Sequence, residues 1–231
     1  MKWAYPPSNS IGWIDTRLNK ETIEYLWKIV KKGEKDGNNA QGGLVGNINK
    51  SFYIEDENQW FYRNVLMPSI DFYMNHDKTP FDNSFNKFKG DYIIKDKNNK
   101  VIEFKSIGLD LNSFWANYQK KHEFNPLHNH NGVFSFVIWL KIPYETEDQC
   151  KLPFLDGIDE SNKFPGQFEF SMLDWEGNIR QIPYRLGKED EGRMLFFPSS
   201  LHHVVHPFYD NDENRVSISG NLNLSITCNV G

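Results

Sequence analysis

The sequence lacks both an excess of positive charge and any long apolar run. Its 26 Lys and Arg residues are outnumbered by 31 Asp and Glu residues, which gives a formal net charge of −5. No basic stripe follows any segment, which argues against a nucleic-acid binder. No apolar run approaches the length of about 20 residues that spans a bilayer, and the N-terminus lacks the apolar stretch of a signal peptide. We therefore expect a soluble, cytoplasmic protein with no membrane or nucleic-acid partner.

Cysteine is also scarce. The two cysteines, Cys150 and Cys228, lie far apart and outside any C-x-x-C pattern. This usage favours a reducing compartment over a secreted protein held together by disulfides.

Helical patterns are confined to the N-terminal part of the chain. Residues 1–18 predict an irregular lead-in. A helix over 19–33 is indicated by apolar residues at helical spacing, with Asn19 as its cap and basic residues and a glycine at its end. A second helical pattern over 56–74 contains Pro68, which predicts a kink or two shorter pieces. We expect these helices to pack on a sheet, although they also offer a surface for a homodimer.

Short strands occupy most of the remaining chain. Turn-rich segments separate the predicted strands, which are 92–94, 101–104, 109–118, 126–142, 167–173, 179–186, 193–197, 201–209 and 215–226. The polar segment 143–166 is a long loop and a candidate lid. Helices followed by many short strands indicate a mainly β fold, as a sandwich, barrel or jelly roll. We expect one domain over 1–231, with helical and irregular support over about 1–90 and the β core over about 91–226.

Histidine is concentrated in two short windows. His128 and His130 form a His-x-His pair, and side chains two apart on a strand share a face, so both imidazoles can reach one metal ion. His203 lies in the second window, F-F-P-S-S-L-H-H-V-V-H-P, after a turn. Such a pair followed by a strand-borne histidine predicts a metal site. We interpret His202 and His206, which should face the opposite side, as structural.

An arginine follows in the segment R-V-S-I-S-G-N. Arg215, Ser217 and Ser219 share one face of this predicted strand. A lone arginine on a face of small polar residues indicates recognition of a carboxylate, because its planar fork can donate two parallel hydrogen bonds. The alternative is an outward-facing arginine on a solvated strand.

Four motifs in this order resemble the iron- and 2-oxoglutarate-dependent oxygenases, in particular a phage and marine-bacterial subgroup with a His-x-His…His motif. The motifs are W-A-N-Y-Q at 115–119, E-F-N-P-L-H-N-H-N-G at 123–132, F-P-S-S-L-H-H-V-V-H-P at 197–207 and R-V-S-I-S-G-N at 215–221. The resemblance covers roughly residues 40–225. It implies a double-stranded β-helix, the jelly roll of the cupins, with Fe(II) at its open end and 2-oxoglutarate as cosubstrate.

The same resemblance implies a set of metal ligands. His128 and His130 take the first two ligand positions and His203 takes the distal one. Most of the wider superfamily has a carboxylate where this chain has His130, whereas the subgroup shares the His-x-His form. Three neutral imidazoles suit iron, zinc, copper and nickel alike, so ligand type leaves open both the metal and the participation of His130.

The resemblance also implies how the cosubstrate and substrate bind. Arg215, helped by Ser217, would pair with the far carboxylate of 2-oxoglutarate, and Asn117 or Tyr118 would hydrogen-bond the cosubstrate from the neighbouring strand. The implied reaction uses dioxygen, converts 2-oxoglutarate to succinate and CO2, and hydroxylates a substrate. A prolyl or other peptide side chain is the first candidate substrate, and a small molecule is the other.

Two other functions stay open on the sequence alone. A cupin-like dioxygenase would use the three histidines without 2-oxoglutarate and would leave Arg215 without its carboxylate partner. A non-catalytic jelly-roll binding module, for example for sugars, would form no succinate under any condition.

Overall fold

The structure is a computed structural model that describes residues 1–4, 12–43, 45–75, 94–95, 98, 101–102, 104–174 and 176–228. The strands are β1 (Lys2–Ala4), β2 (Trp13–Arg17), β3 (Lys50–Tyr53), β4 (Ile94–Lys95), β5 (Val101–Ile102), β6 (Phe104–Gln119), β7 (Asn125–His128), β8 (Phe134–Lys141), β9 (Phe168–Leu173), β10 (Ile179–Tyr184), β11 (Arg193–Pro198), β12 (His202–Val205) and β13 (Arg215–Cys228). The α-helices are α1 (Lys20–Asp36), α2 (Met67–Met74) and α4 (Thr146–Gln149). Single helical turns lie at Gln41–Gly43, Glu57–Gln59, Tyr62–Leu66, Pro153–Leu155, Glu160–Asn162 and Lys188–Asp190.

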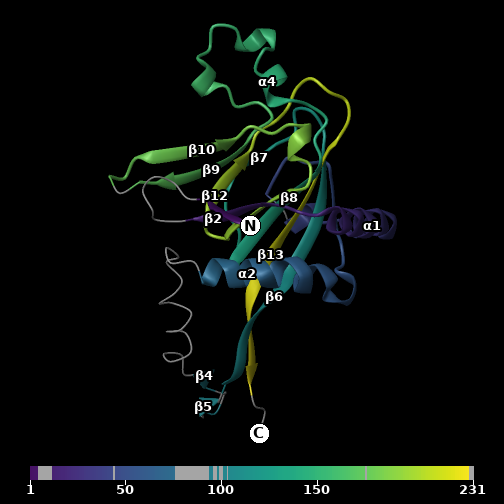
Figure 1. The fold of residues 1–231 in the computed structure, drawn as a ribbon, viewed down its shortest axis with the longest axis vertical. Helices are drawn as coiled ribbons and strands as arrows, with labels where there is room; N and C mark the ends of the chain where they lie inside the picture. Colours follow the sequence, from purple (N-terminus) through teal and green to yellow (C-terminus); the bar gives the residue numbers. More distant parts are fainter. Residues whose placement is uncertain are drawn as a thin grey trace.

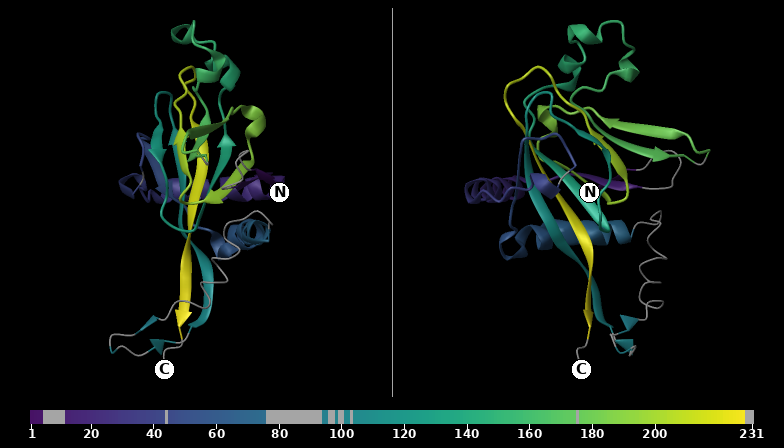
Figure 2. Two further views of the ribbon diagram at one scale, coloured as in Figure 1. Left: turned by 90° about the vertical axis from the view of Figure 1, so that its left-hand side faces the viewer. Right: turned by 180° about the vertical axis from the view of Figure 1, so that it is seen from behind.

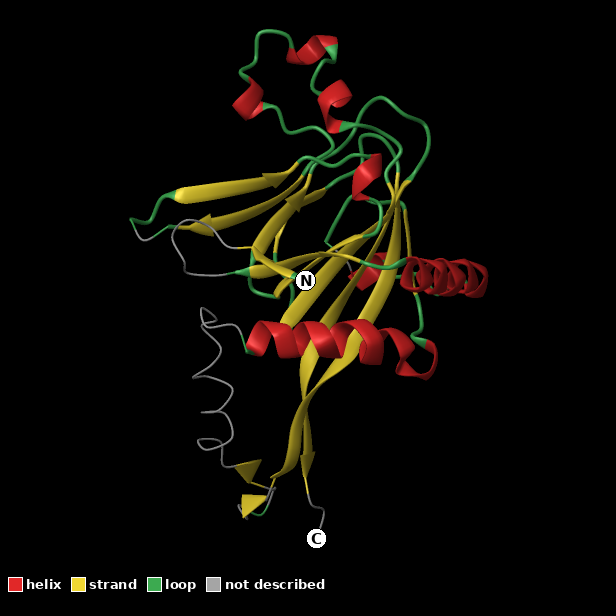
Figure 3. Cartoon of the chain, viewed as in Figure 1, coloured by secondary structure: helices red, strands yellow, loops and turns green. Residues whose placement is uncertain are grey.

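Two antiparallel sheets form the body of the protein (Figures 1 and 3). The larger sheet has the strand order β1-β2-β11-β8-β13-β6-β3, and the smaller one has the order β10-β9-β12-β7. Four of the strand pairs are nested along the chain: β9 with β10, β8 with β11, β7 with β12 and β6 with β13. This nesting is a long antiparallel hairpin rolled into two facing sheets, which is a jelly roll. The fold is therefore mainly β, as predicted.

Two hydrophobic cores lie on opposite faces of the larger sheet. The first packs the sheet against α1 and the helical segment that ends with α2, through residues such as Leu26, Phe61 and Tyr73. The second fills the space between the two sheets with aromatic residues such as Trp139 and Phe168. Because both of its faces are covered, β8 is buried from its first residue to the next to last. In Figure 2, the two views show the long strands β6 and β13 running past α2 to the extremity of the molecule where the C-terminus lies, where β6 begins and β13 ends.

Helix α1 begins where the sequence predicts. The side chain of Asn19 caps the helix and accepts a hydrogen bond from the Thr22 backbone N–H at 2.8 Å. The helix continues to Asp36, beyond the predicted end, and Gly37 terminates it with a left-handed φ of 70°.

No helix within the described residues is long and apolar enough to cross a membrane.

Gly33, which the sequence indicates as the helix end, instead lies inside α1 against β3. A Cβ atom at this position would come within 2.7 Å of Ile54 Cγ2 and 2.9 Å of the Tyr53 carbonyl oxygen. The glycine therefore permits close packing of the helix on the strand. The second helical segment is divided as predicted, because a π-helical turn precedes α2 and Pro68 lies in the first turn of α2.

Two other expectations about strands were wrong. Residues 1–18 are not wholly irregular: they contain β1 and β2, and β2 pairs with β11 far along the chain. Local sequence does not reveal such a long-range pairing. The predicted strand 126–142 is broken after β7, and Gly132 in the break has a φ of 116°. Parts of the predicted strands 92–94 and 101–104 lie outside the described residues.

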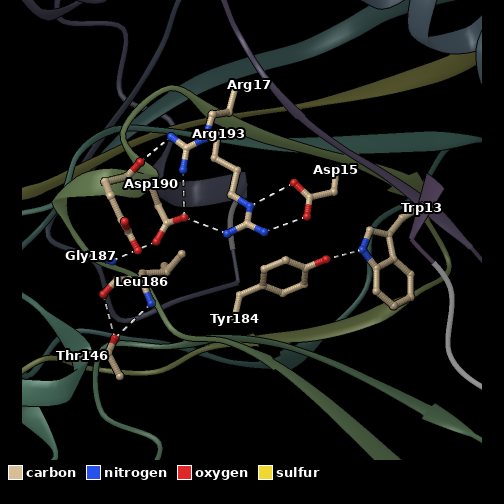
Figure 4. A network of polar contacts seen from close by, with 10 residues as sticks. Trp13, Asp15, Arg17, Thr146, Tyr184, Leu186, Gly187, Asp190 and Arg193 are labelled. Atoms are coloured by element: carbon tan, nitrogen blue, oxygen red, sulfur yellow. Dashed lines mark hydrogen bonds and ion pairs between the residues drawn. The ribbon is translucent and has the colours of Figure 1, made fainter. Parts of the chain in front are cut away.

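A buried ion-pair network fastens β2 to the jelly roll (Figure 4). Arg193 of β11 donates to both carboxylate oxygens of Asp15, at 3.0 and 2.7 Å, and to Asp190 at 2.7 Å. Beside it, the Trp13 indole N–H donates to the Tyr184 hydroxyl at 2.5 Å. The charge of Arg193 is thus matched by two carboxylates.

Candidate metal centre

Three histidines converge between the two sheets. His128, at the end of β7, is the direct cross-strand partner of His203 on β12. His130 follows two residues after His128, and one ring nitrogen of each histidine lies within 4.8 Å of the others. Among the described residues, no Asp or Glu joins this cluster. Two imidazoles on adjacent strands and a third from the following loop form a set of nitrogen ligands.

The position of His130 differs from the one the sequence suggests. The histidine pair was expected on one strand face, but β7 ends at His128 and His130 lies in the loop beyond it. The backbone N–H of His130 donates to the Ser199 carbonyl at 2.9 Å, and its ring lies 5.8 Å from that of Trp115. A contact with the turn after β11, rather than strand periodicity, therefore brings this ring to the cluster.

The hydrogen bonds of the cluster set its protonation. Nδ1 of His128 lies 2.6 Å from the Pro126 carbonyl, and Nδ1 of His203 lies 3.0 Å from the Leu201 carbonyl. A carbonyl only accepts, so each Nδ1 carries the proton and each Nε2 keeps a lone pair for a metal.

Burial keeps all three rings neutral. Loss of solvation lowers the pKa of His128 and His203, and together with the nearby His128 it lowers the pKa of His130 to about 4. Neutral imidazole is the form that ligates a metal, so the cluster fits a divalent ion such as iron without further deprotonation.

A cavity extends from the histidines along the face that the neighbouring strands β6 and β13 turn toward the smaller sheet. It is lined by Asn117 and Gln119 from β6 and by Arg215, Ser217 and Ser219 from β13. Among the described residues in its lining, Arg215 alone has a permanent formal charge. The arginine therefore faces inward, and the alternative of a solvated strand face is wrong.

Arg215 is buried in neutral surroundings, with 1% of its surface exposed. Its Nε and Nη2 donate to Gln119 Oε1 at 3.2 and 2.5 Å. Its Nη1 donates to the Tyr144 hydroxyl and to the Gly166 carbonyl, and Nη2 also donates to the His206 carbonyl at 3.3 Å. In the described part of the chain, these partners are all uncharged. A buried guanidinium without a counter-charge attracts an anion.

The sequence of residues 113–221 matches the protein family described as “Putative 2OG-Fe(II) oxygenase”. Residues 113–221 are therefore similar to a 2OG-Fe(II) oxygenase domain. Fe(II) and 2-oxoglutarate are the metal and cosubstrate of this family. The three histidines, the cavity residues of β6 and Arg215 all lie inside the matched region. No curated protein sequence matches the chain.

Several solved structures resemble the chain, and two of them are hydroxylases. One is a prolyl-4-hydroxylase from Pseudomonas putida, with 13% identity and a TM-score of 0.48 over 93% of each chain. The other is a prolyl hydroxylase from Trichoplax adhaerens in complex with a hypoxia inducible factor oxygen degradation domain peptide fragment. It has 16% identity and a TM-score of 0.46, and the match covers 94% of this chain and 84% of that chain.

The structure places the two expected cosubstrate residues of β6, Asn117 and Tyr118, on opposite faces of the sheet. Asn117 points into the cavity, where its Oδ1 accepts a hydrogen bond from Ser51 Oγ at 2.6 Å. The ring of Tyr118 lies instead on the other face of the sheet, 5.5 Å from the Phe52 ring and 4.5 Å from Lys50 Nζ. Strand alternation allows only one of two consecutive residues to enter the cavity, so Tyr118 does not line it.

Two other described histidines, His202 and His206, lie outside the metal cluster. His202 is exposed, as expected from its place next to His203, and His206 lies 3.5 Å from the Glu169 carboxylate. Sequence reasoning missed Gln119, although it lies two residues beyond Asn117 on the same strand face. That spacing was the available signal.

Proposed function

We propose that His128, His130 and His203 hold Fe(II) in this oxygenase domain and that Arg215 binds the far carboxylate of 2-oxoglutarate. The observation that carries the proposal is the shared cavity, in which three neutral imidazoles meet a buried guanidinium with no counter-charge. A metal with an open coordination site and an anchored dicarboxylate match these two features together. A three-histidine dioxygenase without 2-oxoglutarate would leave the buried charge unmatched.

The protein residues have binding and positioning roles in this proposal. When bound, Fe(II) and 2-oxoglutarate supply the oxidising chemistry, in which dioxygen is consumed, CO2 and succinate form and a substrate C–H bond becomes C–OH. Arg215 orients the cosubstrate through its planar fork, assisted by Ser217 and Asn117 in the same cavity. Aromatic residues of the second core, including Trp139 and Phe168, surround the site and exclude water.

We further propose that the part of the substrate that enters the cavity and is oxidised there carries no charge. A prolyl or other peptide side chain is the first candidate. The part of the cavity lining that comes from residues 41–48 and 125 is neutral and contains the amides Gln41 and Asn125. Among the described residues, Asn125 Oδ1 has no hydrogen-bond partner, and it can accept a hydrogen bond from a peptide N–H. The segment 143–166 remains our candidate for a lid. The helical segments that precede the jelly roll remain a candidate dimer surface.

The proposal is tested by titrating the apo-protein with Fe(II) and then 2-oxoglutarate under anaerobic conditions. We expect a visible metal-to-ligand charge-transfer band that is lost in Arg215→Met at the same cosubstrate concentration, because the methionine keeps the side-chain volume without the charge. His202→Ala, an exposed histidine outside the cluster, should retain the band. Iron binding without a band would favour a three-histidine dioxygenase, and no iron binding would favour a binding module.

A second measurement tests the substrate class. Peptides that contain proline are incubated with the loaded enzyme, and mass spectrometry is used to follow the gain of one oxygen atom beside succinate formation. Matched peptides with alanine in place of proline are the control. Oxygen incorporation into neither peptide set would contradict the peptide proposal while leaving the iron and cosubstrate assignments intact.

A further inference from the structure

We propose that Gln119 is a positioning residue that makes the cosubstrate site selective for a 2-oxo acid with a second carboxylate. It holds the guanidinium of Arg215 in place without neutralising it, so that the charge stays available to the ligand. This inference rests on the proposed function of the same cavity and deepens it.

The geometry ties the two side chains together. Gln119 of β6 is the direct cross-strand partner of Arg215 in β13 and is 2% exposed. Its Oε1 accepts from Arg215 Nε at 3.2 Å and from Nη2 at 2.5 Å, and its Nε2 donates to the Glu123 carbonyl. A guanidinium only donates and a carbonyl only accepts, so the reversed amide would lose all three hydrogen bonds. The carboxamide is therefore held in one orientation.

The carboxylate of Glu123 forms its hydrogen bonds with groups other than Arg215. The Glu123 carboxylate accepts hydrogen bonds from the backbone N–H groups of Lys120, at 2.9 Å, and Asn49, at 3.2 Å. The Tyr144 hydroxyl accepts a hydrogen bond from Arg215. Because burial raises the pKa of Tyr144, this hydroxyl stays neutral. Arg215 thus donates its hydrogen bonds to neutral groups, and none of these acceptors cancels its charge.

Arg193 gives an internal comparison. This second arginine of the jelly roll also bonds fully to its neighbours, but its partners are the carboxylates of Asp15 and Asp190. A structural arginine of this fold is therefore neutralised, whereas Arg215 is oriented by a carboxamide where a glutamate of the same length would have formed an ion pair. A site that binds a carboxylate needs an arginine that is held in place but not yet neutralised, and Arg215 meets both conditions.

Gln119→Glu tests the role of the missing charge. We compare the binding of 2-oxoglutarate with that of 2-oxopentanoate, which has a methyl group in place of the far carboxylate. Binding to the Fe(II)-loaded, anaerobic protein is followed through the fluorescence of Trp115 and Trp139, which line the cavity. The wild type should prefer 2-oxoglutarate, and Gln119→Glu should reduce that preference on the order of 10- to 100-fold, the range of one charge-assisted hydrogen bond.

Two further variants separate charge from structure. Gln59→Glu makes the same replacement on the surface, where Gln59 accepts from Arg63 at 3.4 Å, and should leave the preference unchanged. Gln119→Met leaves the charge of Arg215 unneutralised but removes the hydrogen bonds that orient its guanidinium. This variant should reduce the preference for 2-oxoglutarate several-fold. It also serves as the test if Gln119→Glu does not fold, as judged by thermal unfolding.

The outcomes are distinguishable from failure of the proposed function. If wild-type protein binds neither 2-oxo acid, the proposed function fails and this inference fails with it. If the wild type prefers 2-oxoglutarate and folded Gln119 variants keep that preference within about twofold, the inference alone is overturned. A lower preference in the Gln119 variants, with Gln59→Glu unchanged, supports it.

Discussion

His202 and His203 are consecutive on β12, but only His203 points between the sheets, where it is 4% exposed. We expect His203→Ala to lower Fe(II) affinity at least about 100-fold, because one of three ligands is lost. His202→Ala removes an exposed imidazole of the same strand and should leave the affinity unchanged. Equilibrium dialysis with Fe(II) under anaerobic conditions measures both, and equal affinities would contradict the ligand assignment.

A second prediction at this scale concerns alkaline pH. Burial raises the pKa of Tyr184 to about 12, whereas an unfolded tyrosine titrates near 10. Below pH 10 both states are protonated, and between pH 10 and 12 only the unfolded state ionises, so stability should fall across this window as pH rises. Chemical denaturation at several pH values should show a weaker fall in Tyr184→Phe. An identical fall in both proteins would assign the effect to other groups.

The site residues differ in how far sequence could place them. His128 and His203 were predicted from their strands and Arg215 from strand alternation, whereas Asn117 was expected only from the family resemblance. His130 reaches the cluster through a backbone contact with a distant turn, which local periodicity does not encode. Alternation also excludes Tyr118 once Asn117 faces inward, so only one of these two alternatives lines the cavity.

At the scale of elements, Gly33 shows how tertiary packing overrides local propensity. Alanine normally stabilises a helix interior by about 1 kcal/mol relative to glycine. In α1, however, the added methyl group would meet Ile54 and the Tyr53 backbone, and overpacking of this kind costs about 1–3 kcal/mol. We therefore expect Gly33→Ala to lower the free energy of unfolding, measured by urea denaturation. Gly42→Ala is the control, because no atom of the described residues lies within 4 Å of its added methyl group.

The same principle explains which elements sequence predicted well. The helix start at Asn19 depends on a local cap, and most strand positions depend on local alternation. The strand β2 depends instead on its partner β11 far along the chain, and Gly33 inside α1 is explained by close packing on β3. Local patterns could not supply these partners.

For the whole molecule, the Arg193 network determines how firmly β2 is attached to the larger sheet. Asp15→Asn removes the charge that Arg193 contacts through two hydrogen bonds. Breaking a buried ion pair from one side costs about 3–5 kcal/mol, and we expect a decrease of this order in unfolding free energy. Arg17→Gln, whose side chain is 56% exposed, should cost less than about 1 kcal/mol. Similar losses in the two variants would contradict a special role for the buried pair.

The place of β13 in the larger sheet has a consequence for folding order. This strand inserts between β6 and β8, both of which leave the ribosome well before it. Loop-closure entropy favours the innermost hairpin, β9 with β10, and makes the outermost pair, β6 with β13, the slowest to close. A nascent chain can thus bring its three histidines together before Arg215 arrives. Under the proposed roles of these residues, the metal site can form before the cosubstrate site during synthesis of the chain.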